Sequence, residues 1–193
     1  MVTQYLSVTW PEYHLLSQKL AAAIFNHSSE VDLIVAISRG GLTLGHLLSD
    51  LMMKPISTIL IQSYTDIQLQ GEVKLVEKLQ TPIVGKRVLI VDDAADTGKT
   101  FHRAIEHLKA FKPKELITVS LYYKPHSSVR PDFYAKQTKK WIIFPYESTE
   151  MIMLITKQME KEGKSKAQIQ DFLTGLGLRE GQIAFTRKHH LLK

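Results

Sequence analysis

The sequence contains no cysteine in its 193 residues. Disulfide bonds, thiolate nucleophiles and cysteine-ligated zinc are therefore excluded. The sequence also lacks any uncharged apolar run that approaches the ~20 residues of a membrane-spanning helix. Its first residues, MVTQYLSVTW, show neither the basic nor the apolar region of a signal peptide. We therefore expect a cytoplasmic protein without a membrane span.

The residues that are present suit one well-buried core and an anionic partner. Hydrophobic residues make up 44% of the chain, and the formal net charge is +6, which would favour either phosphorylated metabolites or nucleic acid. Charge alone does not choose between the two. Acidic residues interleave with the lysines after residue 148, whereas a nucleic-acid surface usually presents charge of one sign. The pattern therefore argues against nucleic-acid binding.

Short apolar runs alternate with helical patterns through the first two thirds of the chain. Apolar runs that are rich in β-branched residues predict strands, and apolar residues at helical spacing predict amphipathic helices. The strands are expected at 33–37, 56–61, 87–91 and 116–122, and the helices at 10–26, 42–51 and 100–111. Buried strands that alternate with helices predict an α/β fold, with a mainly parallel sheet flanked by helices.

Two further segments differ from this alternation. Residues 62–86 are polar and weakly patterned, as is typical of a flap or a mobile hairpin. Residues 148–193 follow a last short strand expected at 141–144. We expect them to form a helical appendage, with a capping box at 165–168 and breaks at Gly175, Gly177 and Gly181. We therefore divide the chain into a domain at 1–147 and a C-terminal appendage at 148–193.

The segment from Val88 to Thr100 carries the clearest chemical pattern. An apolar strand runs into two adjacent carboxylates, Asp92 and Asp93, and then into a turn of small and hydroxyl residues that opens a helix. Backbone N–H groups in such a turn, together with the positive end of the helix, suit a phosphate group. The ending Gly-Lys-Thr matches a Walker A loop, but that motif needs glycine where Asp93 stands, so this alternative fails. The turn consists of Ala94, Ala95, Asp96, Thr97, Gly98, Lys99 and Thr100.

This pattern resembles the phosphoribosyl pyrophosphate (PRPP) signature of the type I phosphoribosyltransferases. An acid before Thr-Gly, here Asp96, is characteristic of the 6-oxopurine branch of that family. Further matches occur in the same order along the chain, at 8–10, 38–41, 63–64, 124–125, 141–142 and 145–147. The resemblance is greatest to the xanthine-guanine enzymes and covers residues 5–147. It implies the type I phosphoribosyltransferase fold, with a flexible loop and a small hood.

The resemblance implies a role for the residues that would bind PRPP. The turn 94–100 would hold the 5-phosphate, and Asp92 and Asp93 would contact the ribose hydroxyls and hold Mg²⁺, which binds through few carboxylates and substrate oxygens. Pyrophosphate would lie on the turn formed by Ser38, Arg39, Gly40 and Gly41. Catalysis would depend on Asp96, Asp92, Asp93 and Arg39.

The resemblance also implies how a purine base would be bound. Asp96 would exchange a proton at N7, Lys124 would donate to the 6-oxo group, Trp141 would stack on the ring, and the Ile142 carbonyl would face C2. Ser63 and Tyr64 would close over the site and exclude water. Lys99 matches hypoxanthine-guanine enzymes and Glu147 matches xanthine-guanine enzymes, so the base preference stays open.

The sequence thus predicts a purine phosphoribosyltransferase that uses Mg²⁺, PRPP and a purine base and assembles as a homo-oligomer, a dimer or a tetramer. An alternative is a regulator of the same fold that senses PRPP or a nucleotide and binds nucleic acid through its appendage. A third reading is transfer to a different acceptor, such as a pyrimidine or a modified purine. Lys124 and Trp141 favour the first interpretation, because a sensor of PRPP needs no platform for a purine.

Overall fold

The computed structural model describes residues 4–27, 30–63 and 73–191. The chain divides into two compact units. Residues Tyr13–Lys139 form the first, which we call the sheet unit, and Met1–Glu12 together with Lys140–Lys193 form the second, which we call the helical unit. Each unit is described by itself.

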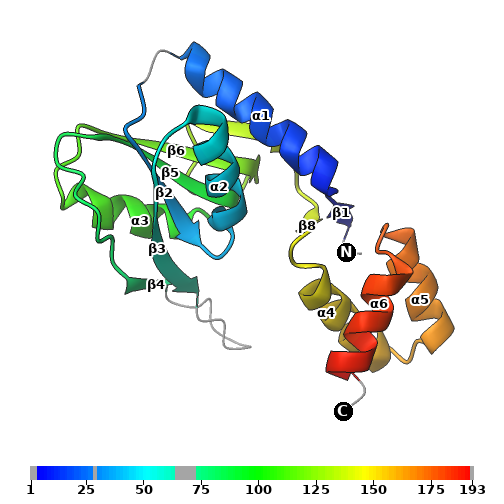
Figure 1. Ribbon diagram of the computed structural model, residues 1–193. Helices are drawn as coiled ribbons and strands as arrows, with labels where there is room; N and C mark the ends of the chain where they lie inside the picture. Colours follow the sequence, from blue (N-terminus) through cyan, green and yellow to red (C-terminus); the bar gives the residue numbers. More distant parts are fainter. Residues whose placement is uncertain (1–3, 28–29, 64–72, 192–193) are drawn as a thin grey trace. The chain divides into compact units, whose positions relative to one another are not determined.

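A six-stranded sheet organises the sheet unit (Figure 1). The strands lie in the order β4-β3-β2-β5-β6-β7, and every neighbouring pair is parallel except β3 and β4. A mainly parallel sheet needs cover on both faces, which explains why its central strands are almost continuously apolar. The strand bounds are β2 (Leu33–Ser38), β3 (Ile56–Ser63), β4 (Val73–Glu77), β5 (Arg87–Ala95), β6 (Glu115–Tyr123) and β7 (Phe133–Gln137).

Helices α2 (Gly41–Met52) and α3 (Lys99–Lys109) cover opposite faces of this sheet. Alternate residues of a strand point to opposite faces. Val35 of β2 belongs to the core that contains Phe101 of α3, whereas its neighbour Ala36 lies against Gly45 of α2. A third helix, α1 (Trp10–Asn26), buries one face that includes Leu16, Leu20 and Ile24 and begins where the Thr9 hydroxyl accepts from the Glu12 N–H.

The centre of the sheet is a topological switch point. Strands β2 and β5 are neighbours, with Ala36 beside Val91, but the chain leaves them toward opposite edges, from β2 to β3 and from β5 to β6. The carboxyl ends of the two strands therefore lie side by side, and so do the turns that follow them. Ligands of open α/β sheets bind at such a point.

The helical unit consists of a two-stranded parallel sheet and the C-terminal helices. Strand β1 (Tyr5–Ser7) pairs with β8 (Trp141–Ile143), so that Leu6 lies beside Ile142. Helices α4 (Ser148–Lys161), α5 (Lys166–Gly175) and α6 (Glu180–Thr186) follow, and α6 continues into the π-helix η1 (Arg187–Leu191). Their apolar core contains Ile143, Met151, Ile152, Ile155, Ile169, Leu173, Leu178 and Ile183.

The α/β fold predicted from the sequence is confirmed, and so is the helical nature of the C-terminal segment. The Ser165 hydroxyl and the Gln168 side chain cap α5 reciprocally, as their spacing predicts. The prediction that Gly181 breaks a helix is wrong, because Gly181 lies inside α6. Within the described residues, no helix combines the length and the apolar character needed to cross a membrane.

Candidate functional site

The turn after β5 occupies the switch point and leads directly into α3. The sequence predicted that the strand ends at residue 91, before the two carboxylates. Strand β5 instead extends through Ala95, so Asp92 and Asp93 lie in its last part. The predicted phosphate turn, 94–100, is shorter in the structure: Ala94 and Ala95 end β5, residues 96–98 connect it to α3, and Lys99 and Thr100 begin that helix. The N–H groups of the first turn of a helix lack partners within the helix and can bind an anion.

Gly98 shapes this turn. Its φ is 84°, in the left-handed region that only glycine adopts at little cost. A Cβ at this position would also lie 2.6 Å from the Ser128 hydroxyl and 2.6 Å from the Val129 nitrogen. Both backbone conformation and space therefore require glycine here.

Asp92 and Asp93 place two carboxylates at the end of a buried strand. Asp92 is only 8% exposed, and Asp93 is half-buried. Burial, and then the charge of Asp93, raises the pKa of the Asp92 carboxyl well above its usual range, and the hydrogen bond that it accepts from the Asp93 N–H at 3.0 Å opposes that rise. The charged form of a buried carboxylate beside a second one costs free energy, and a bound cation would lower that cost.

The turn between β2 and α2 lies directly against the Asp93 carboxylate. A Cβ on Gly40 would lie 2.6 Å from Oδ2 of Asp93, and one on Gly41 would overlap the Val91 carbonyl oxygen. The absence of side chains at these two positions lets the turns after β2 and β5 approach closely. Arg39 is exposed at the tip of the same turn, and its peptide bond with Ser38 is cis. The structure therefore brings Ser38–Gly41 and Asp92–Asp93 together.

Asp96 contacts a third segment, which follows β6. The Lys124 ammonium lies 3.8 Å from Oδ1 of Asp96, and Nε2 of His126 lies 2.9 Å from the same oxygen. Lys124 is 7% exposed, whereas the Asp96 side chain is about half exposed. A buried ammonium needs a nearby anion, and Asp96 supplies one.

Sequence reasoning identified Asp96 and Lys124 but missed three residues beside them. Ser127 and Ser128 pack against Gly98, and the Thr97 carbonyl accepts hydrogen bonds from the N–H and the hydroxyl of Ser128, at 3.0 and 2.8 Å. His126 is the third. The only signal in the sequence is Pro125, which marks a turn; nothing local indicates where that turn packs.

The other predicted site residues do not belong to the turns after β2, β5 and β6. Trp141 is 48% exposed and Ile142 is 7% exposed, and both belong to β8 of the helical unit. Ser63 ends β3, and Tyr64 lies outside the described residues. The convergence of Lys124, Trp141 and Ile142 on one base, and closure by Ser63 and Tyr64, therefore stay predictions.

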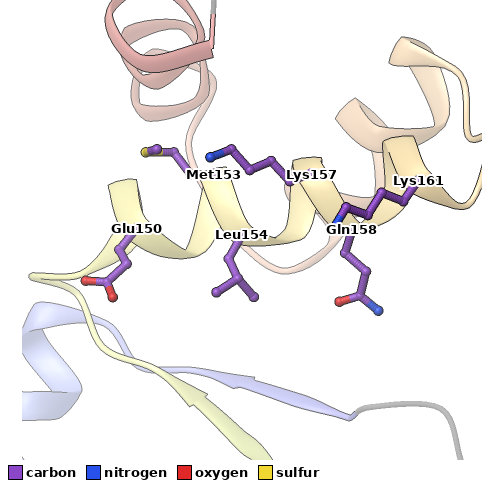
Figure 2. A pocket seen from close by; sticks show the side chains of 6 residues that line it. All are labelled: Glu150, Met153, Leu154, Lys157, Gln158 and Lys161. Atoms are coloured by element: carbon purple, nitrogen blue, oxygen red, sulfur yellow. The ribbon is translucent and has the colours of Figure 1, made fainter. Parts of the chain in front are cut away.

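A hollow along α4 is a separate feature of the helical unit (Figure 2). Six residues of this helix line it: Glu150, Met153, Leu154, Lys157, Gln158 and Lys161. None of them belongs to the predicted phosphate, pyrophosphate or base sites. We therefore place the candidate site at the turns after β2, β5 and β6.

Comparison with known proteins gives one family match and many structural ones. The phosphoribosyl transferase domain family matches residues 8–150. The chain is 33% identical to a purine phosphoribosyltransferase from Pyrococcus horikoshii, with a TM-score of 0.67 and coverage of 74% of this chain and 93% of that one.

Two further solved structures share the fold at lower identity. A Neisseria gonorrhoeae protein solved with bound ppGpp is 23% identical, with a TM-score of 0.68 and coverage of 76% of this chain and 91% of that one. A xanthine-guanine-hypoxanthine phosphoribosyltransferase from Helicobacter pylori is 20% identical, with a TM-score of 0.64 and coverage of 74% and 94%.

Proposed function

This chain belongs to the phosphoribosyl transferase domain family, and from that premise we propose that it transfers the 5-phosphoribosyl group of PRPP to N9 of a 6-oxopurine. The reaction breaks the bond from C1 of the ribose to pyrophosphate and forms the bond from C1 to N9. Pyrophosphate leaves with the bonding electrons, and the base loses one proton. The contact of Asp96 with Lys124, at the edge of the phosphate turn, is the observation that carries this proposal.

The two turns at the switch point would hold PRPP. The 5-phosphate would lie on residues 94–100, where Gly98 and the start of α3 present backbone N–H groups. Pyrophosphate would lie on Ser38–Gly41, where Arg39 supplies a charged donor. The close approach of Gly40 to Asp93 supports this arrangement, because it brings the two turns within reach of one ligand.

Asp92 and Asp93 would hold Mg²⁺. No cluster of three or more candidate metal ligands occurs in the part of the chain that the structure describes. Two adjacent carboxylates nevertheless fit this ion, because Mg²⁺ keeps several waters and completes its shell with substrate oxygens. When bound, it would neutralise the charge that develops on pyrophosphate.

Four of the predicted residues would recognise the base, each in its own way. Asp96 would accept the proton at N7 as N9 forms the glycosidic bond, which is general base catalysis. Lys124 would donate to the 6-oxo group, Trp141 would stack on the ring, and Ile142 would face C2 through its backbone carbonyl. The partly exposed Trp141 ring is compatible with stacking on a ligand.

Three further expectations accompany this proposal. Ser63 and Tyr64 would close over the bound substrates and exclude water. The chain would work in purine salvage in the cytoplasm as a homo-oligomer. The chain would divide into a domain at 1–147 and an appendage at 148–193. This appendage would act through packing, since several of its apolar side chains are buried among themselves.

Turnover measurements test this function directly. The purified chain is incubated with PRPP, Mg²⁺ and one of guanine, hypoxanthine, xanthine, adenine or uracil, and nucleotide and pyrophosphate are quantified. We expect equal amounts of both products with at least one 6-oxopurine, and loss of turnover when EDTA removes the metal. Absence of turnover with all three 6-oxopurines contradicts the proposal, and turnover with uracil alone supports a different acceptor.

A titration with short RNA and DNA separates the enzyme from the regulator. The alternative function predicts tight binding that weakens steeply with salt, because neutralised phosphates release counterions. We expect no such binding at physiological ionic strength. Salt-dependent binding by a chain without turnover would favour the regulator.

A further inference from the structure

His126 stands at the corner of a proline turn beside the proposed catalytic site. The Ser127 N–H donates to the Lys124 carbonyl at 2.9 Å, which closes a four-residue turn with Pro125 and His126 at its centre. Proline at the second position of a turn presets the backbone angle φ and so restricts the turn to few conformations. The backbone therefore fixes the direction in which the His126 side chain leaves the chain.

Hydrogen bonds on both sides of His126 attach this turn to the phosphate turn. The Lys124 N–H donates to the Ala95 carbonyl at 3.0 Å. On the other side, the N–H and the hydroxyl of Ser128 both donate to the Thr97 carbonyl. The acceptors Ala95 and Thr97 flank Asp96, just as the donors flank His126. The two side chains are thus held opposite each other, although they are 30 residues apart in sequence.

The contact between them uses one oxygen of the carboxylate. Nε2 of His126 lies 2.9 Å from Oδ1 of Asp96, and the Lys124 ammonium approaches the same Oδ1 at 3.8 Å. An ionised carboxylate can only accept, so Nε2 carries the hydrogen. The torsion that turns an aspartate carboxylate about its Cβ–Cγ bond has broad preferences, and the Asp96 side chain is about half exposed. Without the His126 donor, the carboxylate would be restrained by the Lys124 ammonium alone among these two groups, at a longer distance.

We infer that His126 is a positioning residue for the reaction proposed above. Its N–H holds Oδ1 of Asp96, which leaves Oδ2 directed at the base to accept the proton. The inference rests on the proposed function, because Asp96 has this task only if the chain transfers a phosphoribosyl group to a purine. Lys124 cannot replace His126, since its ammonium lies farther from Oδ1 and would also serve the 6-oxo group.

Steady-state kinetics of His126→Ala, His126→Gln and wild type test this inference. We expect His126→Ala to lower kcat about tenfold, a small part of the roughly 10²–10⁴-fold that a proton-transferring group contributes. KM for PRPP should stay unchanged, because the phosphate turn is intact. His126→Gln should restore most of kcat. The amide nitrogen of glutamine carries hydrogen and is separated from Cα by the same number of bonds as Nε2 of histidine. His46→Ala, on an exposed part of α2, is the matched control.

A double-mutant cycle separates positioning from a general structural role. If His126 acts only through Asp96, adding His126→Ala to Asp96→Asn should lower kcat no further. The inference is overturned if His126→Ala lowers kcat equally in the wild type and in Asp96→Asn. It is also overturned if His126→Ala leaves kcat unchanged, or if His126→Gln is as slow as His126→Ala. Melting temperatures confirm that the variants are folded. A wild type without turnover on any 6-oxopurine overturns the proposed function itself, and the role of His126 with it.

Discussion

The sheet unit and the helical unit differ in what they bury. The sheet unit buries a carboxylate, Asp92, and an ammonium, Lys124, within a largely apolar core. In the described part of the helical unit, the buried polar residues are two threonines, Thr156 and Thr186. A buried charge costs folding free energy, so it persists where it serves a ligand or a reaction. We therefore expect substitutions at the turns of the sheet unit to change chemistry, and substitutions among the buried side chains of the C-terminal helices to change stability.

We expect the largest loss of turnover at Asp96, and this loss would sharpen the contrast between the two units. Replacement by Asn removes the proton acceptor but keeps the shape of the side chain. We expect kcat to fall by roughly 10²–10⁴-fold, while the Kd for PRPP and the melting temperature stay unchanged. Asp50→Asn, on an exposed part of α2, is the control. Unchanged turnover with guanine, hypoxanthine and xanthine would remove Asp96 from the catalytic machinery.

A loss of stability without a loss of turnover is expected at Leu173, which is completely buried between the C-terminal helices. Leu173→Ala should lower the free energy of unfolding by about 2–5 kcal/mol, because it removes buried surface and leaves a cavity. Below the melting transition, kcat should match that of the wild type. Urea unfolding measures the loss, and Leu154→Ala, at a side chain that is 48% exposed, is the matched control. A tenfold loss of kcat in a folded Leu173→Ala protein would break the contrast.

A substitution at Arg39 tests whether an exposed charge in the sheet unit binds a ligand. Its removal by Arg39→Ala should weaken pyrophosphate binding about 10- to 100-fold, the value of a charge-assisted hydrogen bond, and weaken nucleoside monophosphate binding much less. Calorimetry with each ligand separates the two. Arg103→Ala, whose guanidinium pairs with Glu106 on the surface of α3, is the control. Equal losses for both ligands would make Arg39 a structural residue.

The smallest effect is a gain in stability at Asp92. Because the pKa of this carboxyl is raised in the folded chain, the native state binds its proton more tightly than the unfolded state. The stability that this group contributes is present below the unfolded pKa and is lost as the pH rises through the folded pKa. Asp92→Asn should therefore flatten the pH dependence in this range and stabilise the fold by roughly 0.5–2 kcal/mol at pH 7.

Urea unfolding between pH 4 and pH 8, in EDTA, measures this gain, again with Asp50→Asn as the control. Turnover of Asp92→Asn should fall, so that stability rises where function is lost. A variant that is less stable than the wild type at every pH would show that the buried carboxylate stabilises the fold.

Patterns within a few residues predicted most of the central elements. The β-branched run before Ser38 and the apolar run before Asp92 both became buried strands, and the helices that follow them begin within one residue or so of the glycines. The short strands β1, β4 and β7 were not predicted. They lie at sheet edges or in the two-stranded sheet, where half-exposed positions weaken the apolar signal.

The sequence by itself determined the chemical inventory: a turn for a phosphate, two carboxylates at the end of a buried strand, an Arg-Gly-Gly turn and a lysine before a proline. These features depend on side chains close in sequence, whose burial and turn chemistry are local. Only the tertiary structure decided that Gly40 lies on Asp93 and that His126 faces Asp96. Strands associate through backbone hydrogen bonds that are alike for every residue, so the choice of neighbours follows from the packing of the whole sheet.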